Sequence, residues 1–216
     1  MASQLLEESA HGGQLEPLRG RSEMCRLRQA ARAKHNAEAK QNRGKISRAR
    51  KVSKPALFPS YQTCKQAGLI YVGTSLHARD VGTLQELGIG AVLNCAPAVV
   101  KDPIKKYRSK NIAYAEIDCA DTSSFPILKH LPEASNFIHR NHMKGTNVLV
   151  HCMAGANRSA TIALGHILLR DKPPFLQLFE ETLGRRPCIL SNVDFQLKLC
   201  TLAHSHGLLT YKCHMP

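Results

Sequence analysis

After Pro55 the chain alternates short apolar runs with longer segments in which apolar residues recur every three or four positions. Short runs bounded by glycine or turn residues are typical of β-strands. We expect strands at Gly68–Gly73, Gly90–Cys95, Ile112–Ile117 and Asn147–Cys152. The last of these is apolar on both faces, which predicts a central place in a sheet.

The longer segments are typical of amphipathic helices. They cover Val81–Leu87, Ile127–Met143, Phe175–Leu183 and Ser191–His204, and another helix is expected to have Arg158 in its first turn. Because strands joined through helices usually run parallel in one sheet, the pattern predicts an α/β fold with a mostly parallel sheet.

The first 54 residues lack this alternation of apolar segments and have few apolar side chains after Leu18. They hold 13 Lys and Arg against 5 Glu, a net charge of +8 within the +14 of the whole chain. We expect residues 1–54 to be a basic, largely disordered extension that buries no core, residues 55–210 to form one domain, and residues 211–216 to be a C-terminal tail. An alternative is that KISRARKVSK is a nuclear-localisation segment or binds an acidic partner.

Composition narrows the class of protein further. Hydrophobic content is 43% but aromatic content only 5%, so aliphatic side chains must build most of the core. No apolar run is long enough to cross a membrane, which predicts a cytoplasmic or nuclear protein. The eight cysteines contain no C-x-x-C pair, which argues against a disulfide scaffold or a zinc finger, and no metal or cofactor is expected.

The stretch NVLVHCMAGANRS carries the chemistry. A strand that ends at Cys152 and turns into a helix places the thiol beside unpaired amide groups, which favour the thiolate. The small residues Met153, Ala154, Gly155, Ala156 and Asn157 let the backbone amides curl around an anion, and Arg158 adds a planar fork that matches two oxygens of a tetrahedral oxyanion. This arrangement predicts a phosphate site built around a nucleophile.

HCMAGANRS matches the H-C-x-x-G-x-x-R-S/T signature of the cysteine-dependent protein tyrosine phosphatases. The chain resembles the atypical dual-specificity members, with the resemblance covering about Leu57 to Leu209. It implies a central sheet with helices on both faces and hydrolysis through a cysteinyl-phosphate. The implied substrates are phosphotyrosine and phosphoserine or phosphothreonine in proteins, kinases among them.

A general acid is needed to protonate the leaving oxygen. Asp118 and Asp121 lie on one loop after a predicted strand, and spacing alone does not choose between them. The resemblance favours Asp121, because in dual-specificity phosphatases the acid lies eleven residues before the position of Pro132.

The resemblance also implies supporting roles. Ser159 would stabilise the departing thiolate, and His151 and Asn192 would brace the phosphate loop, although Ser191 stands where the family has proline. Cys95 occupies a position that resembles the resolving cysteine of some related phosphatases, and a buried core thiol is the alternative.

Two other functions remain open. The GANR loop resembles the G-x-N-R loop of RNA 5′-triphosphatases, and the basic extension would favour RNA. The chain could instead be a catalytically weak phospho-binding adaptor. Phosphoinositide hydrolysis is disfavoured, since Met153, Ala156 and Asn157 stand where lipid-directed loops carry lysines.

Overall fold

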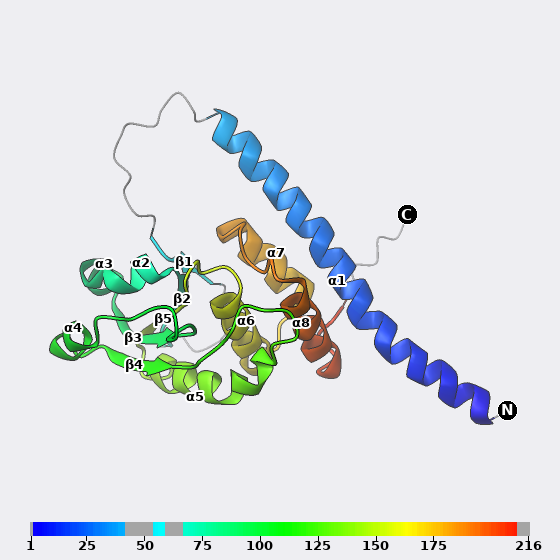
Figure 1. Ribbon diagram of the computed structural model, residues 1–216. Helices are drawn as coiled ribbons and strands as arrows, with labels where there is room; N and C mark the ends of the chain where they lie inside the picture. The colour runs from blue at the N-terminus through cyan, green and yellow to red at the C-terminus, as the bar shows by residue number, and fades with distance from the viewer. Residues whose placement is uncertain (1, 42–53, 59–66, 211–216) are drawn as a thin grey trace.

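The computed structural model describes residues 2–41, 54–58 and 67–210. A five-stranded sheet with the order β1-β2-β5-β3-β4 lies at its centre (Figure 1). The strands are β1 Ala56–Leu57, β2 Ile70–Gly73, β3 Ile89–Asn94, β4 Ala113–Glu116 and β5 Asn147–His151. The last four pair in parallel, and β1 joins the edge of β2 antiparallel.

Strand β5 lies in the middle of the sheet, as its two-sided apolar pattern predicts. Val148, Leu149 and Val150 have no exposed surface, although consecutive side chains point to opposite faces. Both faces of β5 are therefore covered, which places its C-terminal end inside the molecule.

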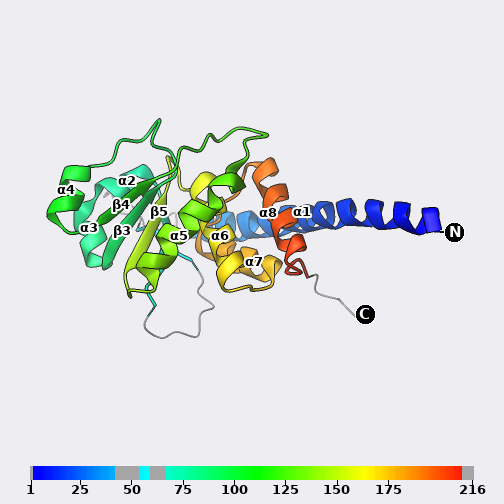
Figure 2. The ribbon, with the colours of Figure 1, turned by 90° about the horizontal axis from the view of Figure 1, so that it is seen from below.

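Nine helices are present in the described part of the chain. They are α1 Ala2–Gln41, α2 Ser75–Arg79, α3 Val81–Glu86, α4 Ile104–Ser109, the 3-10 helix η1 Ile127–His130, α5 Leu131–His142, α6 Arg158–Arg170, α7 Phe175–Arg185 and α8 Val193–Ser205. Helices α2 to α4 lie on one face of the sheet, and α5 and α6 cover the other, with α7 and α8 packed against α6 (Figure 2). The predicted α/β class, with helices on both faces of a mostly parallel sheet, is confirmed.

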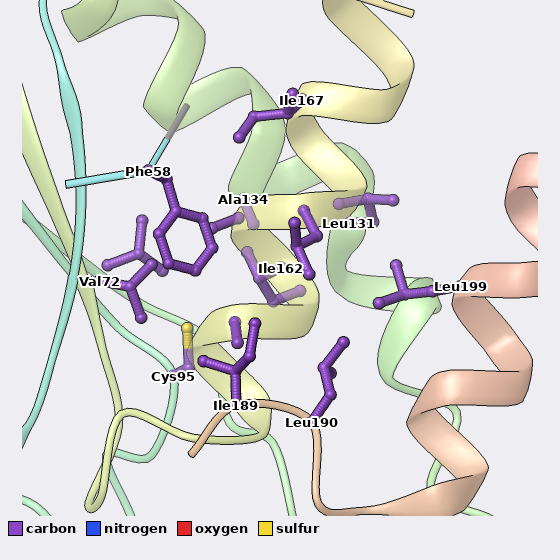
Figure 3. Packing of buried hydrophobic residues seen from close by; sticks show 14 of the residues in the cluster. Phe58, Val72, Cys95, Leu131, Ala134, Ile162, Ile167, Ile189, Leu190 and Leu199 are labelled. Carbon is purple, nitrogen blue, oxygen red and sulfur yellow. The ribbon is translucent and has the colours of Figure 1, made fainter. Parts of the chain in front are cut away.

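Most of the core lies between the sheet and α6. Phe58, Val72, Ile162 and Ile167 meet there, with Leu190 and Leu199 closing the side nearer α8 (Figure 3). From Ser159 to Leu168 every residue of α6 is buried, so this helix is held on all sides. Its first turn, which follows the phosphate loop, is correspondingly fixed.

The helix expected over Ile127–Met143 begins with a 3-10 turn. Pro132 has no backbone N–H, so it cannot bond the carbonyl of Leu128 four residues earlier. Leu131 N–H donates to that carbonyl instead, which closes a three-residue turn.

The expectation of a disordered extension that buries no core was wrong over Ala2–Gln41. These residues form α1, which packs against α7 and α8 (Figure 1). Met24 is fully buried, with Leu27 and Ala31 half-buried against the same core. These three residues recur at helical spacing and form a narrow apolar stripe. The stripe is too short to change the average composition of residues 1–54, which is why the composition did not predict a packed helix. Residues 42–53, with most of KISRARKVSK, and the tail 211–216 lie outside the described residues.

Within the described residues, none of the helices combines the length and apolar character needed to span a membrane.

Candidate active site

The phosphate loop runs from Cys152 to Asn157, between the end of β5 and the start of α6. Gly155 lies at its turn with φ +63°, and a Cβ there would be 2.4 Å from the carbonyl oxygen of Gly73. Only glycine fits both the backbone angle and this close approach to β2. The loop therefore curls tightly over the C-terminal edge of the sheet.

Cys152 lies at the base of this loop with 1% of its surface exposed. Its Sγ atom is 3.3 Å from the Oγ atom of Ser159 in the first turn of α6. The structure thus brings together the predicted nucleophile and the hydroxyl predicted to stabilise it as it departs.

Arg158 is the first residue of α6, and its guanidinium extends toward the loop after β4. It donates from Nη1 to the carbonyl of Cys119 over 3.2 Å, and its Nε atom is 3.8 Å from Oδ2 of Asp121. Nε is buried and forms no hydrogen bond within the described residues. A donor with unused capacity at this place suits an incoming oxyanion.

Of the two acid candidates, Asp121 lies at the phosphate loop. Its Oδ2 accepts from Nδ2 of Asn157 over 3.2 Å, and its Oδ1 accepts from Nδ2 of Asn192 over 3.1 Å. Asp118 is exposed, and its side chain forms no hydrogen bond with the loop in the described part of the chain. The geometry favours Asp121 for the acid role.

Asn157 connects three segments of the site. Its Oδ1 accepts from Ser191 Oγ and from the backbone N–H of Asn192, at 3.0 and 3.1 Å. Asn192 also caps α8, because its side chain accepts from the N–H groups of Asp194 and Phe195. Ser191, the departure from the family pattern, thus supplies a hydroxyl that bonds the phosphate loop.

His151 braces the base of the loop through a partner that sequence reasoning missed. Its Nε2 atom is 2.9 Å from Oδ2 of Asp102, and both side chains are fully buried. Its Nδ1 lies 3.3 Å from the carbonyl of Cys152. Asp102 stands 49 residues earlier in a loop before α4, and nothing in its local sequence marks it as a partner.

Three further supports for the phosphate loop also lacked a sequence signal. Arg186 donates to the carbonyls of Gly155 and Ala154 over 2.7 and 2.8 Å. Leu190 N–H donates to the Ala156 carbonyl, and Ser75 N–H to the Met153 carbonyl, over 2.8 and 3.1 Å. The backbone carbonyls of residues 153 to 156 therefore all accept a hydrogen bond from outside the loop.

Cys95 directly follows β3 and lies in the core beside the site (Figure 3). Burial raises the pKa of this thiol well above its usual range, and the nearby Cys119 and Cys152 act in the same direction. Burial likewise raises the pKa of Cys119 to about 12. Both thiols are free and protonated at neutral pH, and a redox role for Cys95 stays a prediction.

Among the residues that the structure describes, no group of three or more His, Cys, Asp or Glu side chains is placed to hold a metal ion.

Comparison with known proteins places this site in a family context. The family model described as dual specificity phosphatase, catalytic domain, matches residues 70–205. The chain is 31% identical to dual specificity protein phosphatase Mpk3 of Drosophila melanogaster over 132 residues, and 31% identical to human dual specificity protein phosphatase 15 over 130 residues. It is 30% identical to rat dual specificity protein phosphatase 26 over 151 residues.

These matches cover 61%, 60% and 68% of this chain, but 31%, 42% and 71% of the respective relatives. The chain thus spans less than half the length of two of these three relatives.

Solved structures agree on the fold. The crystal structure of DUSP15 superposes with a TM-score of 0.55 at 30% identity, covering 64% of this chain and 86% of that chain. Human DUSP28 superposes with a TM-score of 0.57 over 73% of this chain and 99% of its own, although at 18% identity this likeness concerns the fold alone.

Proposed function

Because the chain belongs to the family of dual specificity phosphatase catalytic domains, we propose that it is a cysteine-dependent protein phosphatase that acts on phosphotyrosine and on phosphoserine or phosphothreonine. The observation that carries this proposal is the convergence of Cys152, Ser159, Arg158 and Asp121 on one phosphate loop. Each lies within hydrogen-bonding or ion-pair reach of another member or of the loop itself.

In the first step, the thiolate of Cys152 attacks phosphorus and an S–P bond forms as the P–O bond to the substrate breaks. Asp121 gives its proton to the departing oxygen. Arg158 and the loop amides bind the equatorial oxygens, whose charge they stabilise in the transition state. The unused Nε donor of Arg158 supports this role.

In the second step, water attacks the cysteinyl-phosphate. Asp121, now ionised, accepts a proton from the water as the O–P bond forms and the S–P bond breaks. Ser159 donates to the departing thiolate, since its Oγ lies 3.3 Å from Sγ. Inorganic phosphate leaves and the thiolate is restored.

The contacts of Asn157 weigh against the RNA 5′-triphosphatase. Its side chain bonds Asp121, Ser191 and Asn192, so the asparagine before the arginine is accounted for within the protein. An intact nucleophile, arginine and acid likewise weigh against a binding-only adaptor. A phosphoprotein substrate and a cytoplasmic or nuclear location remain part of the proposal.

The test is phosphate release by the full chain, without added metal, from a peptide doubly phosphorylated on Thr and Tyr and from 5′-triphosphorylated RNA. We expect turnover of the peptide and its loss in Cys152→Ser. Faster release from RNA would favour the triphosphatase, and no release from either substrate would favour the adaptor.

A further inference from the structure

A hollow lies between α1, the start of β1 and the segment after α7. Its volume is about 810 Å³. The residues that line it come from three separate parts of the chain; they are Arg32, Asn36, Lys54, Pro55, Ala56, Arg185, Arg186, Pro187 and Cys188. The hollow lies next to the phosphate loop, because Arg186 donates to Ala154 and Gly155 of that loop.

The lining is strongly cationic. Four of its side chains are Lys or Arg, and no lining residue is acidic. Arg32 and Lys54 are exposed and pair with no carboxylate within the described residues.

Two of the four cations are held in place by backbone carbonyls. Arg185 donates to the carbonyl of Leu57 over 3.2 Å, and Arg186 is fixed by its two bonds to the phosphate loop. Guanidinium groups that are already ordered lose little conformational freedom when they bind an anion.

Like charges at this place oppose one another. Arg28, one helical turn before Arg32 on α1, has its pKa lowered by burial and by the charge of Arg32. Arg28 does not line the hollow, but Arg32 does, and an anion beside Arg32 would offset the part of this effect that comes from its charge. A group with several phosphates matches four cations and a space of this size better than a single phosphate does.

We propose that this hollow binds a multiply phosphorylated inositol group, free or as a lipid headgroup, which the protein holds without hydrolysing. Hydrolysis in the phosphate loop would use the buried thiol of Cys152 as nucleophile. The cysteine that lines the hollow, Cys188, is exposed, so the hollow has no corresponding buried nucleophile. The proposal concerns binding alone and does not depend on the proposed phosphatase activity.

The experiment uses the full chain carrying Arg158→Ala, which weakens anion binding at the phosphate loop. Calorimetric titration with inositol hexakisphosphate is expected to show binding to a single site, with an affinity that falls as the salt concentration is raised. Adding Arg32→Gln and Lys54→Gln should weaken this binding at least tenfold. A matched control, Arg26→Gln with Lys105→Gln, removes the same charge from exposed positions outside the hollow and should leave it within about twofold.

Circular dichroism of each variant checks that all of them fold.

A second binding experiment uses vesicles that contain phosphatidylinositol 4,5-bisphosphate. Retention on the vesicles would assign the lipid headgroup, and binding of inositol hexakisphosphate alone would assign a free ligand. An RNA of equal charge is titrated in the same way for comparison. The proposal would be overturned if neither inositol hexakisphosphate nor the vesicles bound, if the two double variants lost affinity equally, or if the RNA bound more tightly.

Discussion

At the scale of single residues, the site depends on side chains that serve two partners at once. Asn192 caps α8 through its Oδ1 and donates from Nδ2 to Asp121. Asn157 accepts from Ser191 and donates to the same Asp121. The carboxyl group is thus held between two amides, one from the residue before α6 and the other from the residue that caps α8.

This geometry predicts different results for the two acid candidates. Asp121→Asn should lower kcat on a phosphotyrosine peptide by about 10²–10⁴-fold, because the leaving oxygen loses its proton donor. The loss should be much smaller on p-nitrophenyl phosphate, whose leaving group departs without protonation. Steady-state kinetics on both substrates measures the difference.

Asp118→Asn is the matched control for that prediction, since Asp118 lies three residues away on the same loop and is exposed. It should change kcat by less than about threefold. An equal or larger loss in Asp118→Asn would assign the acid role to Asp118 instead.

At the scale of elements, α1 reaches the phosphate loop through one chain of hydrogen bonds. Arg28 donates to the carbonyl of Leu190, whose N–H donates to the carbonyl of Ala156. Gln196 of α8 donates to the same Leu190 carbonyl over 2.6 Å. Leu190 is held from both sides at a positive φ of 51°, a backbone angle that costs energy for a residue other than glycine.

Arg28→Ala should therefore loosen the phosphate loop. Loss of a hydrogen bond from a charged donor costs about 1.5–3 kcal/mol of stability. We expect part of this loss to destabilise the transition state as well, so that kcat falls about threefold to tenfold. Arg28→Lys should restore part of it. Kinetics that separate kcat from KM, alongside urea unfolding, distinguish positioning from a general loss of stability.

The control for this prediction is Arg26→Ala, on the same helix, whose guanidinium is exposed and pairs with Glu23. It should leave kcat unchanged. If Arg28→Ala and Arg26→Ala had the same kcat, α1 would have no influence on the site.

The packing of α5 on α6 contains a buried histidine. His166 Nδ1 is 2.8 Å from Ser135 Oγ, and burial lowers the pKa of His166 to about 3, with His142 adding to the effect. The unfolded chain binds a proton near pH 6.5 that the folded protein does not, so stability is full above that pH and falls as the pH drops below it.

At pH 5 this histidine should cost about 2 kcal/mol of unfolding free energy relative to pH 7. His166→Asn, which keeps a polar group near Ser135 but cannot titrate, should show a shallower loss in urea unfolding at the two pH values. His204→Asn, at an exposed position, should behave like the unchanged protein. Parallel pH profiles for all three proteins would contradict the prediction.

At the scale of the whole molecule, α1 belongs to the folded body rather than to a separate extension. Met24 of α1 is fully buried and lies 3.4 Å from Cys200 of α8, measured between the sulfur atoms. Gly20, one turn earlier, lies so close to α8 that a Cβ would be 3.2 Å from the same Cys200 sulfur.

Met24→Ala should therefore lower the free energy of unfolding of the full chain by about 2–5 kcal/mol, because it leaves a cavity between α1 and α8. Leu18→Ala, at a position on α1 that is 44% exposed, should cost far less. Urea unfolding measures both. Equal and small effects would mean that α1 does not unfold with the rest of the molecule.

The sequence alone determined the parts that depend on local pattern. The two-sided apolar run of β5, the fixed spacing from Cys152 to Arg158 and the start of α6 at Arg158 follow from neighbouring residues, because strand, loop and helix preferences act over a few positions. The mostly parallel sheet follows from the order of strands and helices, since the connections leave few topologies open.

Only the tertiary structure decided which distant groups meet. Asp102 braces His151 from 49 residues away, and Arg28 bonds Leu190 from 162 residues away. Neither contact leaves a periodic signal, because each is a single polar pair formed when separate elements pack. The same reason explains why α1 was taken for a disordered extension: its few apolar residues become stabilising only where α7 and α8 provide a surface to cover them.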